Sequence, residues 1–176
     1  MIEVELKVPI ADKNMIAGEL KKIGFVFKKS IIQNDTYFQH PIRDFAKTDE
    51  ALRIRETPEE VFLSYKGPKL DEITKTREEI EISFDNSKNL KKIFEKIGFK
   101  KVIVINKTRE LFEMDEIKAA IDIVEHLGAF LELEILCENK ETMPDKRETL
   151  FSILKKINIS QNSIIRKSYL ELLLKI

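Results

Sequence analysis

The first residues of the chain alternate between apolar and charged side chains. Glu3 and Glu5 fall on one face of a predicted β-strand, and Lys7 follows them on that face, because successive side chains of a strand point to opposite sides. Two carboxylates about 7 Å apart along a strand repel each other unless a cation lies between them. Such paired acids could hold a metal ion, but an ordinary solvated sheet face also alternates apolar and charged residues.

The same alternation recurs along the chain, and it separates the two signs of charge. The acids are Glu3, Glu5, Glu79, Glu81, Asp122, Glu132 and Glu134, and the bases are Lys7, Arg53, Arg55, Lys66, Arg77, Lys107 and Arg109. Carboxylates suit a hard divalent cation such as Mg²⁺ or Mn²⁺, and arginine forks suit phosphate oxygens. A metal-bound nucleotide or other polyphosphate satisfies both. From the pattern alone, solvated faces and a lumen that binds polyphosphate remain equally open.

Composition excludes several classes of protein. The 176 residues contain 31 basic and 31 acidic side chains, so no overall basic field points to nucleic acid. One cysteine allows no internal disulfide and indicates a reducing compartment. The chain has neither an N-terminal signal pattern nor an apolar run of membrane-spanning length. We therefore expect a cytoplasmic protein with no nucleic-acid or membrane partner.

Hydrophobic periodicity predicts the elements that must position these residues. Alternation predicts strands over 1–8, 25–40, 50–56, 61–66, 74–84, 99–114, 118–125 and 129–137, with Pro9 ending the first and Gly67-Pro68 closing the fourth. Apolar stripes and capping residues predict helices over 12–22 and 86–97, from 142 or 145 to 157, and from 161 or 167 to the end. Residues 42–49 are interpreted as a loop or a short helical turn.

A faint internal repeat runs through this pattern. Residues 21–25 resemble residues 95–99, and their glycines, Gly24 and Gly98, lie 74 positions apart. Each segment follows a helix, and each helix follows a strand with paired acids. The repeat indicates two similar halves, and two antiparallel halves that close on each other would form a barrel.

Several other polar residues are interpreted as structural. His40 and His126 lack a second ligand at metal-binding spacing, and Cys137 ends an apolar strand, where a packed thiol is common. Tyr37 and Tyr169 are interpreted as core residues whose hydroxyls find local partners.

In order and spacing, the charged motifs resemble the CYTH superfamily, the triphosphate tunnel metalloenzymes. Glu3-x-Glu5-x-Lys7 resembles its signature. Further segments resemble the class IV adenylyl cyclase branch: Asp35-Thr36-Tyr37-Phe38, Glu50-Ala51-Leu52-Arg53-Ile54-Arg55, Tyr65-Lys66-Gly67, Lys107-Thr108-Arg109, Asp122, Gly128-x-Phe130-x-Glu132-Leu133-Glu134 and Ser168-Tyr169-Leu170-x-Leu172. The resemblance covers nearly the whole chain, so we expect a single domain over residues 1–176.

The resemblance implies an α+β fold: a closed eight-stranded antiparallel β-barrel with a charged lumen and helices packed outside. It implies metal ligands Glu3, Glu5, Glu132 and Glu134 with Asp122 nearby, and triphosphate ligands Lys7, Arg53, Arg55, Lys66, Lys107 and Arg109. Glu3, Glu5, Lys7 and Asp122 are the expected catalytic group. Glu79 and Glu81 are expected lumen acids of open role. The resemblance also implies a homodimer.

Three functions remain open at this point. The resemblance favours an adenylyl cyclase, which converts ATP to cyclic AMP and pyrophosphate. A triphosphatase acting on tripolyphosphate, a nucleotide or thiamine triphosphate is the alternative, because cyclases of this branch carry a His-Phe-x-Gly-Arg segment before the acidic strand and this sequence starts at Met1. A polyphosphate-binding module is the third, but so many carboxylates would repel its ligand.

Overall fold

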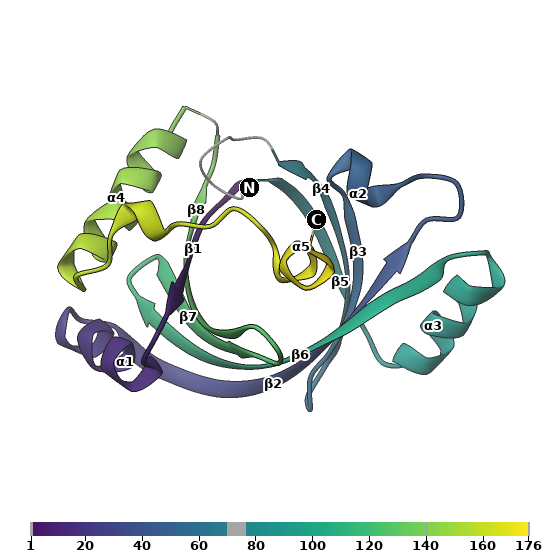
Figure 1. Ribbon diagram of the computed structural model, residues 1–176, viewed down its shortest axis with the longest axis horizontal. Helices are drawn as coiled ribbons and strands as arrows, with labels where there is room; N and C mark the ends of the chain where they lie inside the picture. Colours follow the sequence, from purple (N-terminus) through teal and green to yellow (C-terminus); the bar gives the residue numbers. More distant parts are fainter. Residues whose placement is uncertain (1, 70–76, 140, 176) are drawn as a thin grey trace.

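The computed structural model describes residues 2–69, 77–139 and 141–175. Eight antiparallel strands form one curled sheet in the order β1-β8-β7-β6-β2-β3-β4-β5 (Figure 1). The strands are β1 (Ile2–Ile10), β2 (Val26–Gln39), β3 (Ala51–Glu56), β4 (Val61–Lys69), β5 (Arg77–Phe84), β6 (Lys100–Met114), β7 (Ile117–Val124) and β8 (Gly128–Cys137). Each overlaps a strand expected from the alternation. The expected start of the fifth strand at residue 74 lies outside the described residues.

Two prolines fall inside strands that they were expected to end. Strand β1 continues through Pro9, which lies opposite Phe130 of β8. Because β1 is the first strand of the sheet, it can tolerate a residue without an N–H. Strand β4 continues through Pro68, where its register against β5 shifts between Lys66 and Lys69. Such a shift absorbs the interruption.

The helices are α1 (Lys13–Lys22), α2 (Phe45–Thr48), α3 (Ser87–Lys96), α4 (Met143–Lys156) and α5 (Tyr169–Leu174), with a 3₁₀ turn at Gln161–Ser163. The expected last helix is thus two short elements joined by extended chain. Helix α1 begins after Asp12, whose carboxylate accepts hydrogen bonds from the Asn14 and Met15 N–H groups, as expected for an N-cap. None of the described helices is long and apolar enough to cross a membrane.

The internal repeat is visible in the geometry. Helices α1 and α3 begin and end 74 positions apart, and each ends before a glycine in the left-handed region: Gly24 at φ 110° and Gly98 at φ 98°. Strands β2 and β6 pair with Gln33 opposite Lys107, two residues that are also 74 positions apart. A pseudo-two-fold axis therefore passes between these strands and relates the halves of the sheet.

The largest apolar core lies on the convex side of the sheet, under α1 and α4. Leu6 and Leu133 of the sheet pack with Leu20 of α1 and with Leu150 and Leu154 of α4, and all five are at most 1% exposed. Helix α3 covers the other half through Phe94. These three helices lie outside the curl (Figure 1), as expected.

The structure departs from the expected closed barrel at two points. In the described residues β1 pairs with β8 and β5 pairs with β4, with no ladder between β1 and β5. Charged side chains occupy the concave side and need water or a ligand, so an open curl suits them. Helix α5 lies inside the curl rather than outside it (Figure 1), because its first residue, Tyr169, packs against Phe130 on the concave face.

Candidate functional site: a charged cavity inside the curled sheet

The concave side of the sheet contains a cavity of about 820 Å³. The alternation expected from the sequence turns one face of each strand toward it. Every predicted site residue except Asp122 lines this cavity. Asp122 is fully buried behind the wall and touches residues that line it. The structure thus gathers the predicted residues at one place.

Asp122 lies at the centre of a first cluster, which we call the Asp122 cluster. Its carboxylate accepts hydrogen bonds from Lys107 Nζ at 3.0 Å, from Arg109 Nε at 2.7 Å and Nη2 at 2.6 Å, and from the Tyr169 hydroxyl at 2.9 Å. Burial alone would raise the pKa of Asp122, but Arg109 and Lys107 hold it below its usual value. Asp122 is therefore a buried anion that positions cations.

Two further residues extend the Asp122 cluster toward β1. Lys7 Nζ lies 3.0 Å from Glu132 Oε1, and Arg109 also contacts Glu132. Burial, with the nearby Arg109 charge, lowers the pKa of Lys107 to about 8. The expected metal ligands Asp122 and Glu132 are thus engaged by cations here.

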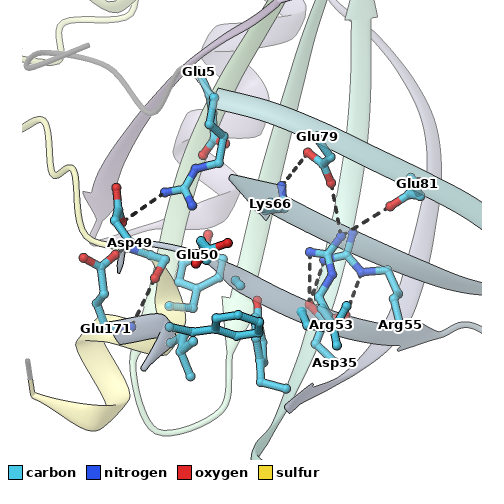
Figure 2. Close-up of a pocket in the computed structure, with 18 of the residues that line it drawn as sticks. Glu5, Asp35, Asp49, Glu50, Arg53, Arg55, Lys66, Glu79, Glu81 and Glu171 are labelled. Carbon is cyan, nitrogen blue, oxygen red and sulfur yellow. Dashed lines mark hydrogen bonds and ion pairs between the residues drawn. The ribbon is translucent and has the colours of Figure 1, made fainter. Parts of the chain in front are cut away.

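A second cluster, which we call the Asp35 cluster, surrounds a carboxylate on β2. Arg55 donates to Asp35 through Nε and Nη2, both at 2.7 Å, and Arg53 Nη1 lies 3.8 Å away. Desolvation opposes ionisation of Asp35, but Arg55 and then Arg53 hold its pKa well below its ordinary value. The paired arginines point from β3 into the cavity (Figure 2).

Strand β5 supplies acids to the other side of these arginines. Arg53 donates to Ser64 Oγ at 3.0 Å and lies 3.4 Å from Glu81 and 3.7 Å from Glu79. Lys66 Nζ donates to Glu79 Oε2 at 2.6 Å, and the Lys66 and Arg53 charges lower the pKa of Glu79 against the opposing effect of burial. Glu79 and Glu81 therefore neutralise positive charge on Arg53 and Lys66 (Figure 2).

Three carboxylates remain together at the edge formed by β1 and β8. Glu5 lies directly opposite Glu134 in the strand register, and like charges in that position destabilise a sheet. Burial, together with the Glu134 and Glu5 carboxylates, raises the pKa of Glu3 to about 8. We call Glu3, Glu5 and Glu134 the acidic edge. The described residues contain no three acids, histidines or cysteines already gathered around a metal position.

The two clusters are related by the pseudo-two-fold axis, with their charges exchanged. Asp35 and Arg109 are 74 positions apart, and each binds the neighbouring strand through two hydrogen bonds, Asp35 to Arg55 and Arg109 to Asp122. The same pair of hydrogen bonds thus recurs with acid and base swapped. The swap places a guanidinium group in each cluster.

Two functional candidates were not predicted as site residues. Asp35 shares a strand face with Gln33 and Tyr37, and an acid on an otherwise uncharged face was the available signal. Tyr169 was interpreted as a core residue, and its position beside the cavity residues Lys7 and Lys107 required the fold. Arg77 also lines the cavity and lies 3.8 Å from Asp49, in the segment that follows α2.

Apolar side chains also line the cavity. They are Phe45 of α2, Leu52 of β3, Val102 of β6, and Leu170 and Leu174 of α5, and the charged Asp49, Glu50 and Glu171 line it as well. The sequence pattern identified no pocket for a nucleobase, because the apolar residues come from four separate elements. A cavity of a few hundred cubic ångströms with both apolar and charged walls is typical of a small-molecule site.

Comparison with known proteins places the chain among proteins of one family. The CYTH domain matches residues 1–169. A Methanocaldococcus jannaschii protein, MJ0240, whose name proposes an adenylate cyclase, is 51% identical over 98% of both chains. Adenylate cyclase CyaB of Aeromonas hydrophila is 25% identical over 95% of this chain and 86% of its own.

Solved structures share the fold. The PH1819 protein of Pyrococcus horikoshii superposes with a TM-score of 0.90 at 41% identity and covers 98% of both chains. HpAC1 of Hippeastrum, an adenylyl cyclase candidate with a dominant triphosphatase activity, has a TM-score of 0.68 at 20% identity, covering 99% of this chain and 95% of its own. At that identity the likeness extends to the fold alone.

Proposed function

The chain belongs to the CYTH domain family, and from that premise we propose that it is a metal-dependent enzyme acting on a triphosphate in its concave cavity. Class IV adenylyl cyclase, which forms cyclic AMP and pyrophosphate from ATP, is the activity we infer. The names of MJ0240 and CyaB support this choice. We further propose a single catalytic domain that works in the cytoplasm.

One observation carries the proposal: six cations and a separate set of acids line the same cavity. The cations are Lys7, Arg53, Arg55, Lys66, Lys107 and Arg109. Guanidinium and ammonium groups match the oxygens of a polyphosphate. We call these six cations the basic wall. Each of them is held by a carboxylate behind or beside it, so the basic wall is preorganised and needs no large rearrangement to bind an anion.

The acidic edge is suited to a hard divalent cation. Glu3, Glu5 and Glu134 raise one another's energy when ionised, and carboxylate oxygens are the donors that Mg²⁺ and Mn²⁺ prefer. When bound there, the cation would neutralise phosphate charge and lower the pKa of a nucleophile. We assign metal binding to these three residues, and we assign Asp122 and Glu132 to the positioning of cations.

The residues of the chain then divide the work. Arg53, Arg55 and Lys66 bind one end of the triphosphate, and Lys7 and Arg109 bind the other. Charge that develops on phosphate oxygens in the transition state is stabilised by these fixed donors. Apolar lining residues such as Leu52 and Leu170 would contact the nucleoside.

Triphosphate hydrolysis is the second candidate, because the same cavity would serve either nucleophile. A ribose 3′-hydroxyl attacking the α-phosphorus makes the enzyme a cyclase, whereas water attacking the terminal phosphorus makes it a triphosphatase. The apolar side chains of the cavity favour a triphosphate with an organic group over tripolyphosphate, and the names of MJ0240 and CyaB favour the cyclase.

The experiment that tests the proposal is a product analysis. Purified protein is incubated with ATP or tripolyphosphate, with Mg²⁺ or Mn²⁺, and the products are separated. Cyclic AMP with pyrophosphate is the expected result. Orthophosphate without cyclic AMP would replace the cyclase with the triphosphatase, and no turnover with tight binding of tripolyphosphate would leave a binding module.

A pair of variants gives the assay its control. Glu5→Gln removes one carboxylate from the acidic edge and should raise the metal concentration needed for half-maximal activity about tenfold. Glu138→Gln, an exposed acid just beyond β8, should leave that concentration unchanged. Equal metal requirements in both variants would remove Glu5 from the metal site.

A further inference from the structure

Tyr169 is the first residue of α5 and lies close to both lysines of the Asp122 cluster. Its side chain is buried, with 6% of its surface exposed. Lys7 Nζ lies 3.5 Å from the centroid of its ring and Lys107 Nζ lies 5.1 Å from it. Both distances fall within the range of cation–π attraction, and the first is a direct contact.

The hydroxyl of Tyr169 fixes the ring in this position. It donates to Asp122 Oδ2 at 2.9 Å, the oxygen that also accepts from Lys107 and Arg109. The ring edge packs against Phe130 at a centroid distance of 5.2 Å. One side chain thus contacts both lysines and their shared anion.

The charges of the cluster explain why such a ring matters. Three cations, Lys7, Lys107 and Arg109, share the carboxylates of Asp122 and Glu132. A basic wall with excess positive charge can bind an anion, but it repels itself while the anion is absent. The negative face of an aromatic ring attracts a buried ammonium group without adding a full negative charge that would repel phosphate.

The C-terminal segment is built to deliver this ring. Ile165 N–H donates to the Lys7 carbonyl oxygen at 2.9 Å, so the segment is anchored beside the lysine that the ring contacts. Ser168 and Glu171 form a reciprocal capping box that starts α5 at Tyr169. A capping box sets where a helix begins, and here it sets where the ring points.

From these contacts we propose that Tyr169 is a positioning residue for anion binding: its ring holds the Lys7 and Lys107 ammonium groups at the cavity wall, ready for a polyphosphate. The inference rests on the proposed function, because it assigns to Tyr169 the preorganisation of two of the phosphate-binding cations. The residue acts through the lysines and needs no contact with the phosphate.

Two substitutions separate the ring from the hydroxyl. Tyr169→Leu removes the ring and should weaken the binding of tripolyphosphate to the metal-free protein about tenfold. Tyr169→Phe retains the ring and should weaken binding about threefold or less. Titration calorimetry with tripolyphosphate gives both dissociation constants, and the chemical shifts of the Lys7 ε-methylene protons report whether the ring still covers the lysine.

Leu173→Ala is the matched control. Leu173 belongs to the same helix and the same apolar cluster, so its truncation loosens α5 without removing the ring. We expect a lower melting temperature in this variant, with tripolyphosphate bound nearly as tightly as by the wild-type protein.

Three other outcomes would overturn the inference in distinguishable ways. Wild-type protein that fails to bind tripolyphosphate would refute the proposed function, and the inference with it. If the Tyr169→Leu variant binds tripolyphosphate as tightly as the wild-type protein, the role of Tyr169 is refuted and the proposed function is not. Equal weakening in the Leu and Phe variants would assign the effect to the hydroxyl and would refute the role of the ring.

Discussion

Glu132 and Glu134 lie two residues apart on β8, yet their surroundings have opposite charge. Glu132 meets Lys7 and Arg109, whereas Glu134 faces Glu5 across the register and has a loose, partly exposed ion pair with Lys118 at 3.8 Å. Burial and Glu5 raise the pKa of Glu134 despite Lys118. The resemblance to the CYTH superfamily implied metal binding by both acids, and alternation could not separate them, because it shows which residues share a face and not which charges face them.

These surroundings predict opposite effects of the same substitution. In metal-free protein, Glu134→Gln should raise the free energy of unfolding by about 0.5 kcal/mol, because it relieves a pair of like charges. Glu132→Gln should lower it by about 3 kcal/mol, because it removes the negative charge that the buried cations Lys7 and Arg109 share. Urea unfolding in the presence of a chelator measures both. Destabilisation by both variants would mean that Glu134 is structural.

Asp35 predicts how the protein responds to acid. Its pKa lies below the ordinary value in the folded state because of Arg55 and Arg53, which outweigh burial, whereas the unfolded chain should take up this proton near pH 4. The unfolded state therefore binds more protons as the pH falls from about 5, and the stability that this carboxylate contributes is lost in that direction.

Asp35→Asn should consequently do two things. At pH 7 it should lower the free energy of unfolding by about 3 kcal/mol, since Arg55 loses a buried partner. Between about pH 5 and pH 2 it should flatten the fall in stability relative to the wild type, because one of the acids that drive the fall is gone. Chemical unfolding at several pH values tests this, and parallel pH profiles would contradict it.

At the scale of elements, the repeated helix end is the best-defined local feature. After α1 and α3 the chain reverses through Gly24 and Gly98, and the next residue, Phe25 or Phe99, donates back to a carbonyl in the preceding helix at 3.0 or 2.9 Å. Both glycines adopt positive φ, which a residue with a side chain adopts only at a cost. The repeat was recognisable in sequence because this geometry demands glycine.

Gly98→Ala should therefore lower the free energy of unfolding by about 1 kcal/mol or more, since its Cβ would also lie 3.3 Å from Pro41 Cβ. Gly18→Ala is the internal comparison: this glycine is inside α1, and a Cβ there meets nothing within 4 Å. That change should raise stability by about 0.5–1 kcal/mol. Thermal unfolding of both variants measures the contrast, and equal effects would refute it.

Other elements show where prediction from sequence stops. The alternation of the strands predicted β3, β6 and β7 to within a few residues, because half-buried strands impose a period of two. The position of α5 inside the curl could not be predicted, since it depends on Tyr169 meeting Lys7 and Asp122, residues far away in the chain. Local patterns carry no information about which face a terminal segment covers.

At the scale of the whole molecule, a chain of zero net charge concentrates both signs within one cavity. Spacing predicted that charged side chains of both signs lie on common strand faces, but the separation of the basic wall from the acidic edge required the topology, in which β1 and β5 are the two ends of one sheet. The curl brings these ends toward each other, so that the Lys66 charge acts on the Glu3 carboxylate. We therefore expect a bound cation and a bound anion to stabilise each other.

The separation of the basic wall from the acidic edge predicts that metal and triphosphate strengthen each other's binding. Mg²⁺ at the acidic edge should tighten the binding of tripolyphosphate about tenfold, once formation of the complex between the two in free solution is accounted for. Thermodynamic linkage requires that tripolyphosphate tighten the binding of Mg²⁺ by the same factor. Glu3→Gln should reduce this coupling, because it removes charge from the acidic edge, whereas the exposed Glu138→Gln should preserve it. Calorimetric titrations of each ligand with and without the other measure the factor, and dissociation constants that do not depend on the second ligand would show that the two ends of the sheet act independently.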